Sequence, residues 1–134
     1  MISQTAEYAL RAMTYLAKRW PEPATGAEIA AVSAVPPSYL SKILNGLSRG
    51  ELVRSRRGKK GGFVLARDPA DVALLEVIQA VDPLRRILVC PRQIPEHCPE
   101  LCPLHRFLDD QIASLMDALG GRTVEPVSGL QIEC

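Results

Sequence analysis

The chain has 134 residues, 47% of them hydrophobic and 23% charged, which suffices for one domain with a core of its own. Its apolar runs fall far short of the roughly 20 residues that span a bilayer. The first residues also lack the basic segment and apolar stretch of a signal peptide. We therefore expect a cytoplasmic protein with no membrane association.

The two halves of the chain carry opposite charge, although the net charge is only +1. Residues 1–67 hold 11 Lys and Arg against 4 Asp and Glu, whereas residues 68–134 hold 5 against 11. A basic half of this kind favours contact with a polyanion. Chance clustering of solvated charges is the alternative that the totals alone leave open.

Three helices are expected in the first 50 residues. The first runs from Thr5 to Arg19, where apolar residues recur every three or four positions, and Pro21 stops it. A capping-box pattern at residues 25–28 begins the second, whose inward side chains are predicted to be Ile29, Ala30 and Val32. Two prolines begin the third, whose buried side is predicted to hold Leu40, Ile43, Leu44 and Leu47.

The remaining elements are a hairpin and two further helices. Strands are expected at 52–55 and 63–66 around a glycine-punctuated basic turn. A fourth helix ends at Asp82-Pro83, and a long apolar stripe from Leu104 to Leu119 marks the last helix. The predicted fold class is mainly α with a small β-hairpin. It comprises a winged helix-turn-helix domain at 1–82, a cysteine-containing sensor loop at 83–101, a dimerisation helix at 102–120 and a flexible tail at 121–134.

Two helices joined by a short turn and followed by a basic hairpin suit DNA binding. The second helix can enter the major groove while the hairpin contacts phosphates or the minor groove. Residues 49–67 hold seven Lys and Arg and a single acid. We expect base contacts from Ser38, Tyr39 and Lys42, and backbone or minor-groove contacts from Arg54, Arg56, Arg57, Lys59 and Lys60. A solvated charged hairpin, and a core position for Tyr39, are the alternatives.

Three of the four cysteines, Cys90, Cys98 and Cys102, lie within thirteen residues. In an intracellular chain with its own core, such a cluster favours metal binding or redox chemistry over disulfides. Thiolates together with His105 suit zinc as well as an iron–sulfur cluster. Unligated thiols in a mobile loop are the remaining alternative. Cys134 lies outside the motif and is expected to be a bystander.

Three segments resemble the Rrf-two family of bacterial winged-helix transcriptional regulators, which includes the IscR, NsrR and RirA types. They are residues 6–12 (AEYALRA), 35–44 (VPPSYLSKIL) and 56–66 (RRGKKGGFVLA), and the helix ending in VIQAVD at 77–82 also fits. The resemblance covers residues 1–82 almost without a gap and extends loosely to about 119. It implies a homodimer joined through the last helix, in which each winged helix reads half of a palindromic double-stranded DNA operator.

The resemblance also implies an iron–sulfur cluster held by Cys90, Cys98 and Cys102, since cluster-bearing members carry three cysteines in this loop. The gaps of seven and three residues depart from the commoner even spacing, which leaves the cluster type, 2Fe–2S or 4Fe–4S, open. The candidates for the fourth ligand are the local His105 and, from the partner's first helix, Glu7. A solvated surface position is the alternative for Glu7.

The sequence thus predicts a homodimeric transcriptional regulator, a repressor or an activator, and not an enzyme. Its DNA binding is expected to respond to a cluster that senses redox state, nitric oxide or iron. The same dimer switched by zinc or by thiol oxidation is one alternative, and a cysteine-based redox enzyme is another. The chain shows no glycine-rich cofactor fingerprint after a strand and no convincing acid–base pair, which speaks against the enzyme.

Overall fold

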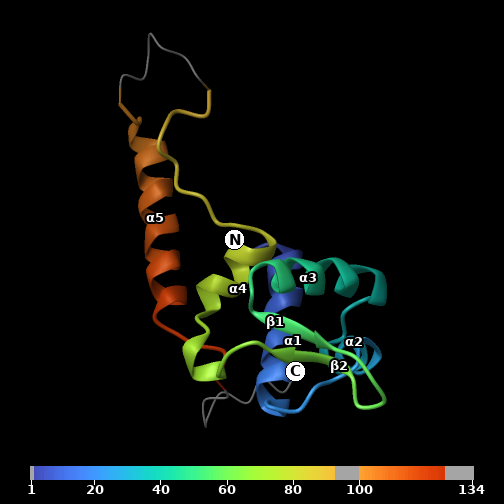
Figure 1. The fold of residues 1–134 in the computed structure, drawn as a ribbon. Coiled ribbons are helices and arrows are strands. Elements are labelled where there is room, and N and C mark those ends of the chain that lie inside the picture. The colour runs from blue at the N-terminus through green and yellow to red at the C-terminus, as the bar shows by residue number, and fades with distance from the viewer. Residues whose placement is uncertain (1, 93–99, 126–134) are drawn as a thin grey trace.

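The computed structural model describes residues 2–92 and 100–125, and it is mainly helical with a two-stranded antiparallel hairpin (Figure 1). The predicted fold class is confirmed at this level. The elements in chain order are α1 (Gln4–Arg19), α2 (Gly26–Ser33), α3 (Pro37–Arg49), β1 (Val53–Arg56), β2 (Gly62–Leu65), the 3₁₀ turn η1 (Pro69–Asp71), α4 (Leu74–Val81) and α5 (Pro103–Gly120). Helices α1 to α4 and the hairpin form one packed body, beside which α5 stands (Figure 1).

Local capping chemistry sets where the helices begin. The N–H of Ala6 donates to Ser3 Oγ at 3.1 Å at the start of α1. At α2 the N–H of Glu28 donates to Thr25 Oγ1, and the Thr25 N–H donates back to the Glu28 carboxylate, which is the predicted capping box. These bonds satisfy donors that the first turn of a helix leaves without an intrahelical partner.

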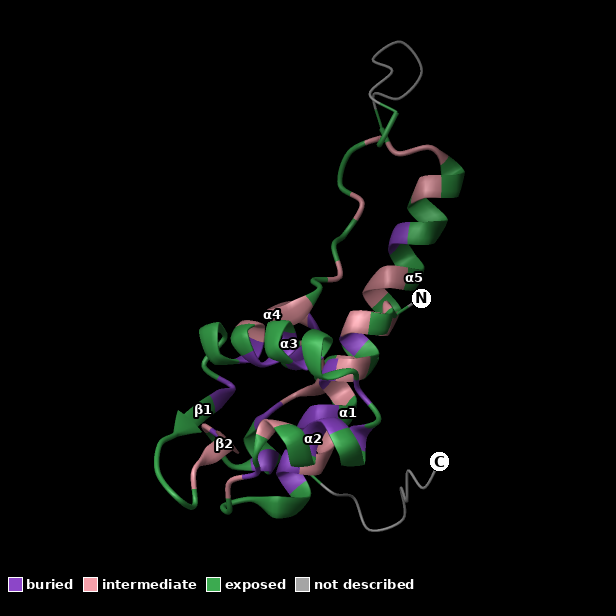
Figure 2. Cartoon of the chain, turned by 90° about the vertical axis from the view of Figure 1, so that its right-hand side faces the viewer, coloured by how far each residue is buried: buried purple, intermediate pink, exposed green. Residues whose placement is uncertain are grey.

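The core lies between α1 and the helices that surround it (Figure 2). Met13 and Leu16 of α1 are fully buried, and α3 buries the four residues predicted for its inner side. The inward prediction for Val32 is wrong, because its side chain is 63% exposed. Ile29, Ala30 and Ser33 set the inward direction of α2, which leaves Val32 on its outer flank.

The hairpin pairs Val53 with Leu65 at its base and Arg56 with Gly62 toward its turn. Each strand is shifted by one residue from its predicted bounds. A third segment joins the hairpin, because Ala24 and Phe63 exchange backbone hydrogen bonds of 2.9 and 2.7 Å. The turn-side half of β2 is therefore hydrogen-bonded to the connection between α1 and α2.

The chain after α5 returns to the packed body. The N–H of Leu74 donates to the Arg122 carbonyl, and the N–H of Val124 donates to the Val72 carbonyl, both at 2.9 Å. Val124 is buried. This part of the predicted flexible tail is thus packed against the start of α4, and residues 126–134 lie outside the described residues. Within the described ranges no helix combines the length and the hydropathy needed to cross a membrane.

Candidate nucleic-acid interface and cysteine site

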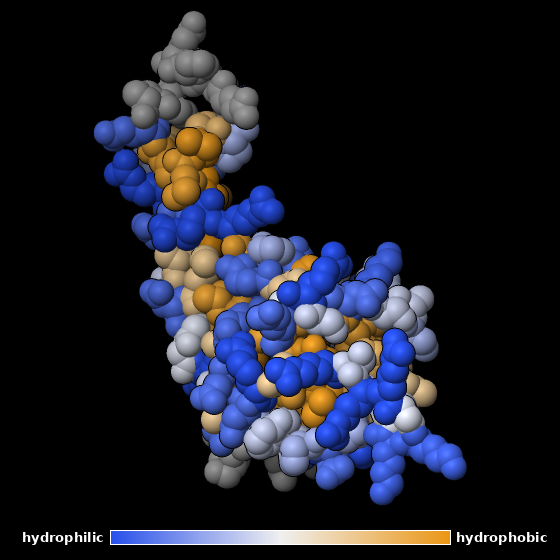
Figure 3. Space-filling view, in the orientation of Figure 1, coloured by the Kyte–Doolittle hydropathy of each residue, from blue (hydrophilic) through white to orange (hydrophobic). Residues whose placement is uncertain are grey.

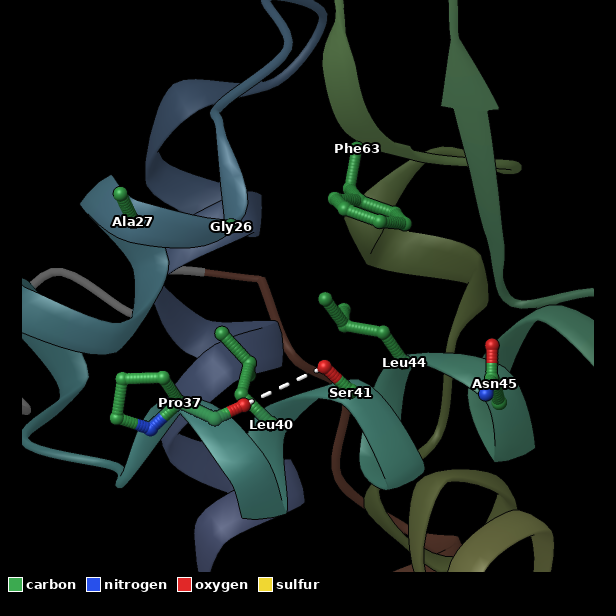
Figure 4. A pocket seen from close by; sticks show the side chains of 8 residues that line it. All are labelled: Gly26, Ala27, Pro37, Leu40, Ser41, Leu44, Asn45 and Phe63. Carbon is green, nitrogen blue, oxygen red and sulfur yellow. Dashed lines mark hydrogen bonds between the residues drawn. The ribbon is translucent and has the colours of Figure 1, made fainter.

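Helix α3 presents a polar ridge between two hollows. Its exposed residues include the predicted base readers Ser38, Tyr39 and Lys42. One hollow, of about 350 Å³, lies between α2, α3 and β2, and Figure 4 shows Phe63 of β2 beside Leu40 and Leu44 of α3 there. The second hollow lies on the other flank of α3. A helix that stands out between two depressions has the shape needed to enter a groove.

Asn45 borders both hollows, which places it on the crest of the ridge. Asn45 was not among the DNA contacts predicted from the sequence. Its exposed amide carries a donor and an acceptor, the pair that can address adenine in the major groove. The sequence signal was its position seven residues after Ser38, which is two turns along the same helix.

The second helix of the pair is oriented by a tight turn. Ala34 adopts a left-handed conformation, with φ of 53°, at the C-terminus of α2. Pro37 then occupies the first turn of α3, where its missing N–H costs nothing. These two residues redirect the chain so that Leu40 faces the core while Ser38 and Tyr39 face outward.

The hairpin holds the five predicted basic contacts on an exposed surface. We call residues 53–65 the wing. Figure 3 shows hydrophilic side chains across this part of the molecule. The ion pairs within residues 2–92 and 100–125 involve none of Arg54, Arg56, Arg57, Lys59 and Lys60, all of which are exposed. Their charge is therefore available to a polyanion.

Helix α1 adds an aromatic and basic cluster that the sequence did not reveal. The ring of Tyr8 meets the ring of Tyr39 edge to face, with centroids 5.8 Å apart. The Arg11 guanidinium lies 5.4 Å from the Tyr8 ring centre and forms a 2.6 Å ion pair with Glu7. Tyr39 is accordingly neither a core residue nor isolated, since it is 45% exposed and supported from α1. No local pattern could show that α1 and α3 meet at these residues.

The described cysteines are Cys90, in the segment that follows α4, and Cys102, at the start of α5. Cys102 is the N-cap residue of α5, and its Sγ lies 3.2 Å from Nδ1 of His105. Cys90 is half-buried at the other end of the loop. Cys98, like His97 and Cys134, lies outside the described residues. The structure thus brings together Cys102 and His105 of the predicted ligands.

Glu7 is not part of this group within one chain. It pairs with Arg11, and in the described portion of the chain no group of three or more His, Cys, Asp or Glu side chains gathers as metal ligands would. The donor chemistry nevertheless fits a soft or borderline metal. A thiol and an imidazole that converge at 3.2 Å from one helical turn resemble two ligands of a single iron or zinc centre.

Helix α5 leaves the first part of its apolar stripe uncovered, while the later stripe residues are half-buried. Asp109 is its only buried residue, whereas Leu104, Phe107 and Leu108 are 62%, 60% and 41% exposed. Leu88 and Val89 of the preceding segment are exposed as well. Figure 3 shows apolar side chains gathered at this end of the molecule. Packing on its own domain, the alternative to an interface, does not account for this surface.

Comparisons with known proteins agree with this architecture. A protein of Aquifex aeolicus (strain VF5), whose name classes it with HTH-type transcriptional regulators, is 27% identical over 134 residues, which cover 98% of this chain and 93% of that one. The chain spans about half the length of two Mycobacterium tuberculosis relatives that are 38% identical over 86 residues.

Two solved structures share the fold. IscR of T. potens matches with a TM-score of 0.75 at 24% identity, covering 92% of this chain and 82% of that chain. CymR, titled the global cysteine regulator of B. subtilis, matches with a TM-score of 0.74 at 24% identity, covering 92% of each chain. The model of the Rrf2 family, described as an iron-dependent transcriptional regulator, matches residues 2–128. With a winged helix-turn-helix, an exposed basic wing and a family match over nearly its whole length, the chain belongs to the Rrf2 family of transcriptional regulators.

Proposed function

We propose that the chain is a homodimeric, sequence-specific DNA-binding regulator whose operator affinity is controlled by an iron–sulfur cluster. The cluster ligands are Cys90, Cys98 and Cys102. The observation that carries the proposal is the 3.2 Å approach of Cys102 Sγ to His105 Nδ1, at the start of a helix whose far end is anchored in the DNA-reading domain. The role is regulatory rather than catalytic, as in the family.

The DNA-binding part of the proposal assigns two kinds of contact. Ser38, Tyr39, Lys42 and the newly located Asn45 read base edges from α3. Arg54, Arg56, Arg57, Lys59 and Lys60 neutralise phosphates or enter the minor groove from the wing. Each of these side chains is exposed, and the wing carries no acid between residues 53 and 65.

The dimer part of the proposal rests on the apolar stripe of α5. A second copy that packs its own α5 against this stripe would bury it with two-fold symmetry. Each subunit would then present one α3 to one half of a palindromic site. The spacing of the two recognition helices would follow from how the two α5 helices pack.

The cluster part of the proposal rests on the donor set. Thiolates of the three cysteines and the imidazole of His105 are ligands that iron–sulfur clusters accept. A bound cluster would supply redox-active iron. Glu7 of the partner subunit stays the remote candidate for the fourth ligand, and its Arg11 ion pair would then have to open.

A contiguous set of contacts links the cysteine site to the recognition helix. The segment after α5 bonds to residues 72–74 at the start of α4. The far end of α4 packs on α3, where a Cβ at Gly46 would meet the Ala80 carbonyl at 3.2 Å. A change at the start of α5 would therefore reach α3 through closely packed elements, which the coupling between two sites requires.

The test is the absorption spectrum and metal content of anaerobically purified protein. We expect a brown protein with visible charge-transfer bands and bound iron. Cys90→Ala, Cys98→Ala and Cys102→Ala should each abolish or destabilise the chromophore, whereas Cys134→Ala should leave it intact. His105→Ala and Glu7→Gln, compared spectrally, assign the fourth ligand.

Two results would contradict the cluster. A colourless protein with stoichiometric zinc would establish the zinc-switched form of the same dimer. Retention of the full spectrum in any of the three cysteine variants would show that the site has other ligands.

A further inference from the structure

Asp109 is a buried carboxylate on a helix that is otherwise exposed or half-exposed. Its Oδ1 accepts hydrogen bonds from Arg86 Nε at 2.7 Å and from the Ile87 N–H at 2.8 Å. Its Oδ2 accepts one from Arg86 Nη2 at 2.6 Å. A bidentate arginine contact and a backbone N–H donor supply the hydrogen bonds that a desolvated carboxylate requires. We call these three residues the clamp.

The clamp joins two segments that lead to the cysteines. Arg86 and Ile87 belong to the linker, residues 83–92, which has neither helix nor strand and ends beside Cys90. Asp109 lies four residues after His105, so the two share one face of α5, and Cys102 at the N-cap lies within 3.2 Å of His105. Figures 1 and 2 show the linker rising alongside α5 toward the cysteine loop.

The linker from Arg86 to Cys90 is long enough to match the helix from Asp109 back to Cys102. The four residues from Arg86 to Cys90 span at most about 14 Å when extended. The seven residues of helix from Asp109 to Cys102 rise about 10 Å along the axis. Cys90 can therefore come level with Cys102 and His105 on the same side of α5. If Arg86 were bound one turn nearer the C-terminal end of α5, the linker would be too short for Cys90 to come level with Cys102.

We propose that Arg86 and Asp109 are positioning residues that keep Cys90 within reach of Cys102 and His105 before any metal or cluster binds. The proposal deepens the cysteine site and rests on the proposed function for what that site binds. Its physical basis is preorganisation. An unattached linker would have to lose its conformational freedom when the ligands assemble, whereas a clamped one has already lost it.

The first experiment measures this positioning without a cofactor. A Cys98→Ser/Cys134→Ser chain, which keeps Cys90 and Cys102, is equilibrated with reduced and oxidised glutathione to obtain the effective concentration of the two thiols. We expect Asp109→Asn and Arg86→Gln to lower that concentration at least tenfold. Arg86→Lys keeps the charge but loses the bidentate contact. Its effective thiol concentration should lie between those of these two variants and that of the parent.

Matched controls separate the clamp from general charge effects. Arg85→Gln and Asp110→Asn remove the neighbouring exposed charges. Their effective thiol concentrations should stay within twofold of the parent value. Circular dichroism and sedimentation verify that each variant folds and keeps its subunit state. Because Arg86 is exposed, its substitution tests the clamp even where Asp109→Asn loosens α5. Clamp variants that match the parent, or a parent whose two thiols show no mutual proximity, overturn the proposal.

The second experiment titrates the full-cysteine apo chain with Co²⁺ alone and follows thiolate-to-cobalt absorption. Clamp variants should bind at least tenfold more weakly than the parent and the two controls. A parent that takes up neither Co²⁺ nor a cluster, but whose thiol coupling falls in the clamp variants, refutes the proposed cofactor and supports the clamp. A parent that assembles the cluster, with thiol coupling and Co²⁺ affinity unaffected by the clamp variants, refutes the clamp and leaves the proposed function standing.

Discussion

Gly62 lies where the wing meets the rest of the domain, and its φ is 140°, a value that L residues rarely adopt. A Cβ at this position would stand 2.3 Å from the Ala24 carbonyl oxygen. That carbonyl accepts the Phe63 N–H and so belongs to the joint between β2 of the wing and the connection from α1 to α2. The glycine is thus required both by its backbone conformation and by the close approach of the backbone at Ala24.

We predict that Gly62→Ala lowers the free energy of unfolding by about 1–3 kcal/mol, because it adds backbone strain and forces Ala24 away from the wing. Urea unfolding measures the loss, and DNA affinity should fall with it. Gly26→Ala is the matched control, since its Cβ would meet only the Phe63 ring at 3.9 Å. Equal stability of the two variants would show that the joint does not constrain the wing.

Two carboxylates tie distant segments together, and their pKa values reflect it. Hydrogen bonds from Arg86, and to a lesser degree the Ile87 N–H, hold the pKa of Asp109 below its ordinary value, although burial opposes them. Hydrogen bonds from Arg67 and then the Ala73 N–H likewise lower the pKa of Glu76. The same pairing raises the pKa of Arg86, which therefore stays charged.

A lowered pKa in the folded state makes stability depend on acid. The contribution of Asp109 is fully present above its unfolded value of about 3.9 and is lost as the pH falls through its lower folded value. We therefore predict that the melting temperature declines below about pH 4 and that Asp109→Asn makes this decline shallower. Thermal unfolding by circular dichroism between about pH 2 and about pH 6 tests it. Asp110→Asn should leave the slope unchanged; a parent-like slope in Asp109→Asn would exclude the clamp as its source.

Helix α5 exposes apolar side chains that no other part of the described chain covers. Its apolar side chains are exposed at the end that carries the cysteines, while its other end is fastened to the start of α4. An apolar helix face of this kind is stable in water when a second surface covers it. A second copy of the same helix is the occupant that two-fold symmetry offers.

We predict that Phe107→Asp converts the proposed dimer into monomers in sedimentation equilibrium, because a desolvated carboxylate in an apolar interface is strongly unfavourable. Phe107 is exposed within its own chain, so the monomer should keep its helical circular dichroism. Arg106→Asp places a carboxylate at an exposed position on the opposite side of α5 and should stay dimeric. An unchanged dimer in Phe107→Asp would exclude this face as the interface.

The charge asymmetry of the whole molecule follows its architecture. The basic half contains α3 and the wing, and the acidic half contains α4 and α5. Positive charge is thereby concentrated on the surface proposed to meet DNA. Negative charge on the other part disfavours non-specific DNA contact there.

Binding by the wing predicts a defined dependence on salt. Each phosphate contact contributes about 0.9 to the slope of log affinity against log salt. Arg57→Ala/Lys59→Ala should therefore lower the magnitude of the slope by up to about 1.8 per subunit and weaken all sequences alike. Asn45→Ala should instead change which sequence is preferred. Fluorescence anisotropy over a salt series measures both effects.

Loss of two positive charges elsewhere provides the control. Lys18→Ala/Arg122→Ala removes exposed cations that lie on neither α3 nor the wing and should leave the slope unaltered. A slope that does not respond to the wing substitutions would remove the wing from the interface.

Most of the fold could be predicted from the sequence because its signals are local. The Thr25–Glu28 capping box lies within one helical turn, and the buried side of α3 follows from a period of 3.6 residues. Glycines in the basic turn indicated the wing, although each strand lies one residue away from its predicted bounds. The candidate DNA surface could be predicted in the same way, since the helical period alone places Ser38 and Lys42 on the outer side of α3. Inward and outward directions were less certain in short α2, where Val32 was misplaced.

The sequence by itself therefore determined the helices, the basic hairpin and the identity of the cysteine-rich segment. The tertiary structure alone decided which distant residues meet. It placed Tyr8 against Tyr39, returned Val124 to Val72 after α5, and brought Arg86 to Asp109 across 23 positions. Such contacts depend on how whole elements pack, and neither periodicity nor composition encodes the distance between residues so far apart in the chain. One of these contacts, between Arg86 and Asp109, fastens the linker that leads to Cys90 against α5.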